Sequence, residues 1–173
     1  PEQLAAVRAE LGLNKPLPVQ YVDYVTDAVQ GDLGRSYVND RAVSAAIAAR
    51  LPTTLFLTLA GFLVSLTIAI PAGILSATNR GEWLDGVGLG FGLLGVSIPN
   101  FWLGILLLLL FGVNLDWLPV AGYVSPLEDP VAGIRYLLLP GITLGTAMAA
   151  VVTRMLRSEL LEELRREYLN AVR

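Results

Sequence analysis

Long uncharged stretches alternate with polar segments along the chain. Three stretches contain no charged residue: 51–79, 86–115 and 136–153. A helix needs about 20 predominantly apolar residues to cross roughly 30 Å of hydrocarbon; the first two stretches exceed this length and the third is at the lower end of the range. The pattern therefore predicts an all-α, polytopic membrane protein whose transmembrane region, 51–153, holds three helices, at about 52–77, 87–112 and 136–153.

Residues 1–50 are polar and are predicted to form short helices. Apolar residues at helical spacing predict a first helix before the Asn14-Lys15-Pro16 turn, a second over Val19–Gln30 and a third over Asp40–Arg50, with Asp40 as its N-cap. Helices this short are not stable alone in water. We expect them to pack on the outer surface of the membrane helices.

Proline and glycine divide the uncharged stretches. Pro52 suits a first helical turn, and Pro71-Ala72-Gly73 is expected to interrupt the first membrane helix. The pairs Gly88/Gly92 and Gly141/Gly145 have the spacing that lets membrane helices approach closely.

Pro99 and Asn100 lie in the middle of the second stretch. Non-helical backbone inside a membrane is tolerated where it faces protein or a water-filled cavity, so three residues are candidates for lining a translocation path: Ser97, Pro99 and Asn100. A kink that only improves packing is the alternative interpretation.

Basic residues predict the orientation. The turn at 78–85 and the C-terminal segment carry six arginines: Arg80, Arg154, Arg157, Arg165, Arg166 and Arg173. The segment 1–50 and the loop 116–135 have a lower density of Lys and Arg. By the positive-inside rule, residues 154–173 lie in the cytoplasm and residues 1–50 outside.

Residues 154–173 continue the third predicted membrane helix without a turn signal. Leucines and one tyrosine form a stripe of helical period on this charged segment: Leu156, Leu160, Leu161, Leu164 and Tyr168. Two interpretations remain open for it. The helix is either solvated or lying on lipid, or it docks into a groove of a soluble partner with the leucines as anchors.

Composition excludes several classes of function. The chain is 54% hydrophobic, has a net charge of −3 and lacks both Cys and His, which removes thiolate and imidazole chemistry. Its basic residues are not clustered as a nucleic-acid interface requires. Because the sequence has no Gly-Lys-Ser or Gly-Lys-Thr phosphate loop, we expect a protein that is not an enzyme and binds no cofactor itself. No acidic residue or Lys lies inside the uncharged stretches, which argues against an ion-coupled carrier.

Several motifs together resemble the first permease subunit of dipeptide, oligopeptide and nickel-type ABC importers. They occur in order along nearly the whole chain: GDLGRSY at 31–37, RLPTTL at 50–55, IPAGILSATNRGEWLD at 70–85, GVSIPNFWLGILLLLLF at 95–111, LDWLPVAGY at 115–123 and YLLLPGITLG at 136–145. The resemblance implies the membrane-domain fold of a type I importer, in part: six helices in the whole subunit, of which the second, third and fourth are present here.

The resemblance also gives the C-terminal helix a role. Residues 167–173 resemble the start of the EAA loop, whose short coupling helix fits a cleft on the ATP-binding subunit. Ala171 stands where this loop usually has Thr, and Val172 where it has Ala. The residues expected to serve ATPase coupling are Leu160, Leu164, Glu167, Tyr168, Ala171 and Arg173.

The sequence therefore predicts a permease subunit of an ATP-driven importer in the inner membrane of a prokaryote, moving peptides or a related small solute. Its expected partners are a second permease, two ATP-binding subunits that hold ATP and Mg, an extracytoplasmic binding protein, and membrane lipid. A non-transporting membrane scaffold and a passive channel are the alternatives. Because the chain starts without Met and stops inside a helical pattern, we expect a fragment, with one membrane helix before Pro1 and two after Arg173.

Overall fold

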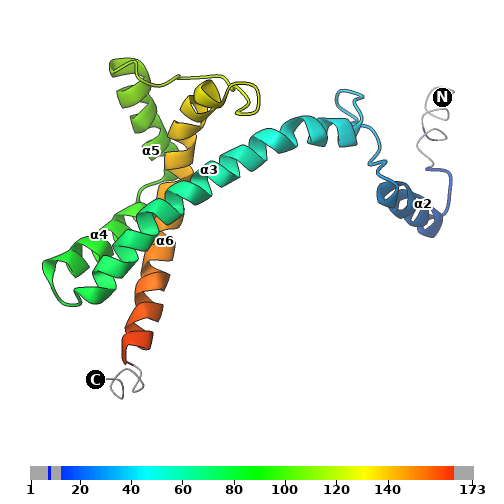
Figure 1. Cartoon of the computed structure of the whole chain (residues 1–173). Coiled ribbons are helices and arrows are strands. Elements are labelled where there is room, and N and C mark those ends of the chain that lie inside the picture. The colour runs from blue at the N-terminus through cyan, green and yellow to red at the C-terminus, as the bar shows by residue number, and fades with distance from the viewer. Residues whose placement is uncertain (1–7, 9–12, 166–173) are drawn as a thin grey trace. The chain divides into compact units, whose positions relative to one another are not determined.

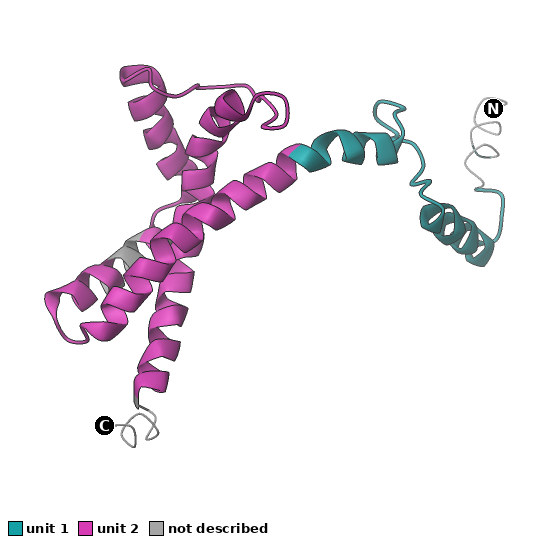
Figure 2. Cartoon of the chain, in the orientation of Figure 1, with its two compact units in different colours: residues 1–52 teal, residues 53–173 magenta. Residues whose placement is uncertain are grey.

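The structure is a computed structural model that describes residue 8 and residues 13–165, without the side chains of residues 89, 91–94, 96 and 165. The chain forms two compact units, residues 1–52 and residues 53–173 (Figure 2). The described helices, labelled in part in Figure 1, are α2 (Leu17–Val29), α3 (Val43–Thr78), α4 (Trp83–Ser97), α5 (Asn100–Leu107), the π-helix η1 (Leu108–Asn114) and α6 (Pro130–Arg165). Within the described ranges there is no strand, only an isolated bridge between Arg35 and Ala42.

The first unit contains α2 and the start of α3. Helix α2 agrees closely with the predicted helix, and positive φ angles at Gly31 and Gly34 turn the chain after it. Asp40 is not the N-cap of a helix, because α3 begins only at Val43. Asp40 has a φ of 51°, and its backbone carbonyl accepts hydrogen bonds from the Arg35 guanidinium at 3.1 and 2.8 Å. The helix predicted before Asn14 falls largely on residues 1–7 and 9–12, outside the described residues.

Helix α3 is one continuous helix from Val43 to Thr78. The expectations of a separate helix ending at Arg50 and of an interruption at Pro71 are therefore wrong. Each proline removes one backbone donor. In apolar surroundings a full break would leave several backbone groups without partners, so the uninterrupted helix is the less costly structure.

The second predicted span is broken where Pro99 lies. Helix α4 ends at Ser97 and α5 begins at Asn100, with Pro99 between them in an extended conformation (φ −61°, ψ 130°). The chain continues as η1 to Asn114. The expected single helix over 87–112 is thus divided into α4 and the run of α5 and η1, because proline disfavours helical geometry in the residue before it.

Small residues bring the helices of the second unit together. A Cβ atom added at Gly145 in α6 would lie 2.7 Å from the Gly61 carbonyl oxygen in α3, and one at Gly141 would lie 3.2 Å from Ala60 Cβ. Helix α4 approaches α3 at Gly88, where an added Cβ would lie 2.9 Å from Ser76 Cβ. The predicted close packing of Gly141, Gly145 and Gly88 is confirmed; the surroundings of Gly92 are not among the described features.

Helices α4 and α5 both rest on α6. A Cβ added at Gly95 in α4 would lie 2.7 Å from Ala150 Cβ, and one at Gly104 in α5 would lie 3.4 Å from Thr143 Cγ2. Helix α6 is therefore the element that α3, α4 and α5 share.

Two described helices, α3 and α6, are long and apolar enough to cross a membrane, and residues 100–114 form a shorter apolar segment. Only 17% of the most apolar window of α3 and 33% of that of α6 is buried within the chain. A core helix of a soluble protein would be mostly buried, so this exposed apolar surface suits lipid or further membrane helices. The predicted class, an α-helical membrane protein, is confirmed.

The substitution Gly145→Ala is expected to lower the free energy of unfolding by about 1–3 kcal/mol, because the new Cβ would overlap the Gly61 carbonyl oxygen and Val64. Titration of the purified protein with SDS in mixed micelles measures this change. The matched control is Gly90→Ala in α4, which has no heavy atom within 4 Å of the new Cβ and should be neutral or slightly stabilising. Equal effects of the two substitutions would contradict the α3–α6 contact.

Candidate functional site

The C-terminal half of α6 carries the described part of the predicted coupling residues. The helix runs without a break to Arg165, which confirms the continuous helical run as far as the structure describes it. Leu160 is partly buried and Leu164 is exposed. Glu167, Tyr168, Ala171 and Arg173 lie outside the described residues. The role of the whole set stays a prediction.

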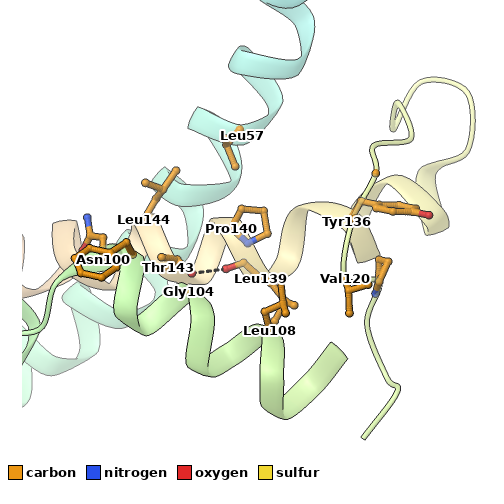
Figure 3. A pocket seen from close by; sticks show the side chains of 14 residues that line it. Leu57, Asn100, Gly104, Leu108, Val120, Tyr136, Leu139, Pro140, Thr143 and Leu144 are labelled. Carbon is orange, nitrogen blue, oxygen red and sulfur yellow. Dashed lines mark hydrogen bonds between the residues drawn. The ribbon is translucent and has the colours of Figure 1, made fainter. Parts of the chain in front are cut away.

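The three candidate path-lining residues lie together at the α4–α5 break. Ser97, Pro99 and Asn100 are all exposed in this chain. Asn100 also lines a groove of about 540 Å³ in the second unit, together with Phe101 and Gly104 of α5 and Leu108 of η1 (Figure 3).

The rest of this groove comes from α6, from Leu57 of α3 and from the segment 119–122. Pro140 has no N–H to donate to the Tyr136 carbonyl, so α6 lacks one helical hydrogen bond where it lines the groove. The Thr143 hydroxyl donates to the Leu139 carbonyl at 2.8 Å, as the dashed line in Figure 3 marks. The walls are therefore mainly apolar with few available polar groups, which suits an apolar side chain or helix face more than a charged solute.

The loop between η1 and α6 is tied to both. Arg135 donates from Nη2 to the Trp117 carbonyl at 2.8 Å. The Trp117 ring lies 5.9 Å from that of Phe111, centroid to centroid. An added Cβ at Gly112 would lie 2.6 Å from Val120 Cγ1, so the lack of a side chain at Gly112 lets the returning loop pack closely on η1.

A network of charged and polar side chains joins three helices at the other end of the second unit. Arg157 of α6 donates from Nε to Asp85 Oδ1 at 2.7 Å and from Nη2 to Asp85 Oδ2 at 2.8 Å. Ser76 of α3 donates to Asp85 Oδ1 at 2.6 Å, and the Gly81 N–H donates to Oδ2 at 3.1 Å. Arg157 Nε also lies 3.0 Å from the Ser76 hydroxyl. Asp85 is 5% exposed and the Arg157 side chain 21% exposed.

These bonds fix the charge state of Asp85, which lies in the first turn of α4 outside the two membrane-length helices. Hydrogen bonds from the Arg157 guanidinium hold the pKa of the Asp85 carboxyl well below its usual value of 3.8, and those from Ser76 and Gly81 act in the same direction. Asp85 is therefore ionised at neutral pH, with both carboxylate oxygens accepting hydrogen bonds.

The sequence analysis missed this network. A usable signal was present, because Asp85 directly precedes the second uncharged stretch and Arg157 closely follows the third. Opposite charges at span ends on the same predicted side can pair, but sequence alone does not show which helices are neighbours. The Asp85–Arg157 contact brings the 78–85 turn and the C-terminal part of α6 to the same end of the second unit. The prediction of orientation from basic residues requires these two segments to lie on one side of the membrane.

No metal site emerges from the described part of the chain, where no three His, Cys, Asp or Glu side chains gather. Among these described residues, the polar contacts that join helices α3, α4 and α6 include the Asp85–Arg157 ion pair and the hydrogen bonds around it.

Comparison with known proteins covers the whole chain. Residues 69–173 match the family described as binding-protein-dependent transport system inner membrane component, and residues 1–58 match the N-terminal family of the same membrane components. A protein of Brucella abortus (strain 2308), named as a peptide transport system permease, is 40% identical over 173 residues, which is 100% of this chain and 55% of that protein. A glutathione transport system permease protein of Salmonella typhi is 39% identical over 170 residues, 98% of this chain and 53% of the relative. The chain thus spans about half the length of these relatives.

The substitution Asp85→Asn is expected to lower the apparent melting temperature by several degrees at every pH from about 5 to about 8. Because folding lowers the pKa of Asp85 below 3.8, its stabilising contribution is complete above that value and is lost as the pH falls through the folded-state pKa. The difference between variant and wild type should shrink below about pH 4. Glu82→Gln, an exposed carboxylate in the same turn, is the control and should leave the melting temperature unchanged. A difference that grows with acidity would contradict the assignment.

The path-lining prediction is tested by introducing cysteine at Asn100, since the chain has no cysteine of its own. Asn100→Cys should react with a membrane-impermeant maleimide several-fold faster than Leu106→Cys, which is on the same helix but does not line the groove. Mass spectrometry of the assembled protein in membranes gives both rates. If Asn100→Cys is protected, the break serves packing alone.

Proposed function

We propose that this chain, which belongs to the family of inner membrane components of binding-protein-dependent transport systems, is part of a permease subunit of an ATP-driven importer. The match to that family and its N-terminal companion, in order along the chain, supports the proposal. So does the helical membrane fold, with α3 and α6 long enough to span a bilayer.

The observation that carries the proposal is the unbroken course of α6. Over Pro130–Arg165 one helix passes from an apolar stretch, packed against α3, α4 and α5, into a charged stretch. At 1.5 Å per residue its 36 residues extend about 54 Å, more than the hydrocarbon thickness. A helix of this kind can carry a displacement at a cytoplasmic docking site into the membrane.

The proposed solute is a peptide or a related small molecule. The relatives are named as permeases for peptides and for glutathione, which is itself a small peptide-like solute. The apolar groove beside Asn100 has few polar groups to select among such solutes, so selectivity is assigned to the binding protein that delivers them.

The proposed assembly places this chain beside a second permease subunit, with lipid around both. Two ATP-binding subunits dock from the cytoplasm and a substrate-binding protein docks from outside. ATP and Mg are bound by the ATP-binding subunits, so this chain transports without being an enzyme.

In the proposed orientation residues 1–50 and the loop 116–135 face outward, where they receive the binding protein. Residues 154–173 face the cytoplasm. Closure of the ATP-binding subunits displaces the segment that follows α6 and shifts the permease pair between inward-facing and outward-facing states, which is a coupling between two global conformations.

Uptake by the complete transporter in proteoliposomes tests this function. Transport of a labelled peptide should require both ATP and the binding protein. Tyr168→Ala and Arg173→Glu should each lower the amount of solute moved per ATP hydrolysed, since they alter the segment assigned to the ATP-binding subunit. The control is Leu13→Ala, an exposed residue in the first unit, which should leave that ratio unchanged.

Three outcomes would contradict the proposal. Uptake that persists without nucleotide would favour a passive channel, and the absence of uptake with all partners assembled would favour a scaffold. Unchanged coupling in both variants would refute the assignment of residues 167–173.

A further inference from the structure

Helix α6 contacts α3 at two separate levels, in addition to its contacts with α4 and α5. The first is the crossing with α3, where Gly145 meets Gly61 and Val64. The second involves Leu156, which packs against Gly73 so closely that an added Cβ there would lie 2.8 Å from Leu156 Cδ2. Twelve residues separate Gly145 from Arg157, which corresponds to about 18 Å along the helix axis.

Apolar contacts at the crossing fix how closely α6 approaches α3, because the Val64 side chain lies against Gly145 and the Leu144 side chain against Gly61. Helix α4 also packs on α6, where Gly95 meets Ala150. A polar attachment about 18 Å from the crossing adds a second fixed point near the C-terminal end of α6. Any displacement of the C-terminal end of α6 must then carry the attached elements with it.

The Asp85–Arg157 pair at the second level fixes the orientation of α6 as well as its distance from α4. A guanidinium that forms two parallel hydrogen bonds with one carboxylate fixes both distance and orientation, which apolar contacts do not. Asp85 in turn is held by Ser76 of α3 and by the Gly81 N–H in the α3–α4 turn. One carboxylate therefore receives donors from α3, from the turn and from α6.

We propose that the Asp85–Arg157 ion pair, supported by Ser76, is a positioning element that makes α6 and the α3–α4 hairpin move as one body during transport. This inference rests on the proposed function, because it assigns the pair a role in ATP-driven coupling. Arg157 lies eleven residues before Tyr168 in the sequence, so the pair attaches α6 close to the end of the helix that leads to residues 167–173. The pair acts through helix position and does not touch the solute.

Replacing the carboxylate by an amide removes the charge and keeps the shape. In the complete transporter, Asp85→Asn should lower the amount of peptide moved per ATP hydrolysed by about tenfold, within the usual range for coupling between sites. Asp85→Glu keeps the carboxylate and should recover most of this ratio. Glu82→Gln, the exposed carboxylate of the same turn, should match the wild type.

A distance measurement separates positioning from mere stability. Spin labels at Arg80→Cys in the α3–α4 turn and Glu162→Cys on α6 report whether the two elements move together; both sites are exposed, and the chain has no other cysteine. With Asp85 intact, the distance distribution should be the same with and without ATP. In Asp85→Asn it should broaden when ATP is added.

The outcomes are distinct. If the wild type shows no ATP-dependent uptake, the proposed function fails and this inference fails with it. If the wild type transports while Asp85→Asn keeps its transport ratio and distances, or loses only assembled protein, the inference alone is wrong. A distance between the two labels that changes with ATP in the wild type would also overturn the inference.

Should Asp85→Asn not assemble, Arg157→Lys takes its place. This variant retains the positive charge without the two parallel hydrogen bonds and should give an intermediate loss of coupling.

Discussion

The close approach of α3 and α6 at Gly61 and Gly145 is the constraint on which the second unit depends. Its contacts are short because neither position carries a side chain, and an added Cβ at Gly145 would meet a backbone carbonyl. In lipid, where apolar burial gives helices little reason to associate, such close packing is a main source of attraction. Helices α4 and α5 then pack on α6 at Gly95 and Gly104.

Two prolines in apolar stretches, Pro71 and Pro99, give different structures. Pro71 leaves α3 intact, whereas Pro99 separates α4 from α5. A helix in hydrocarbon retains its backbone hydrogen bonds wherever it can, so a break persists only where other groups cover it. The break at Pro99 adjoins the groove that Asn100 lines together with residues of α6.

The carboxylate of Asp85 is buried, and it is paired with Arg157. Removing Asp85 and Arg157 from water is costly unless every polar atom is satisfied, and here both carboxylate oxygens accept two hydrogen bonds. Such a pair is weak as a source of net stability compared with an apolar replacement. Its use lies in specificity, because a bidentate contact admits one arrangement of the helices.

The sequence by itself determined the membrane class, the approximate spans and the family, because uncharged length and the order of Gly, Pro and aromatic positions are local properties that survive without knowledge of contacts. It also indicated the packing role of Gly141 and Gly145 and the continuity of α6 as far as Arg165. Only the tertiary structure decided that α3 passes through Pro71, that Asn100 faces a groove with α6, and that Asp85 meets Arg157 across 72 residues of sequence. These features depend on which helices become neighbours. The packing of several helix surfaces together decides this, and no local sequence pattern does.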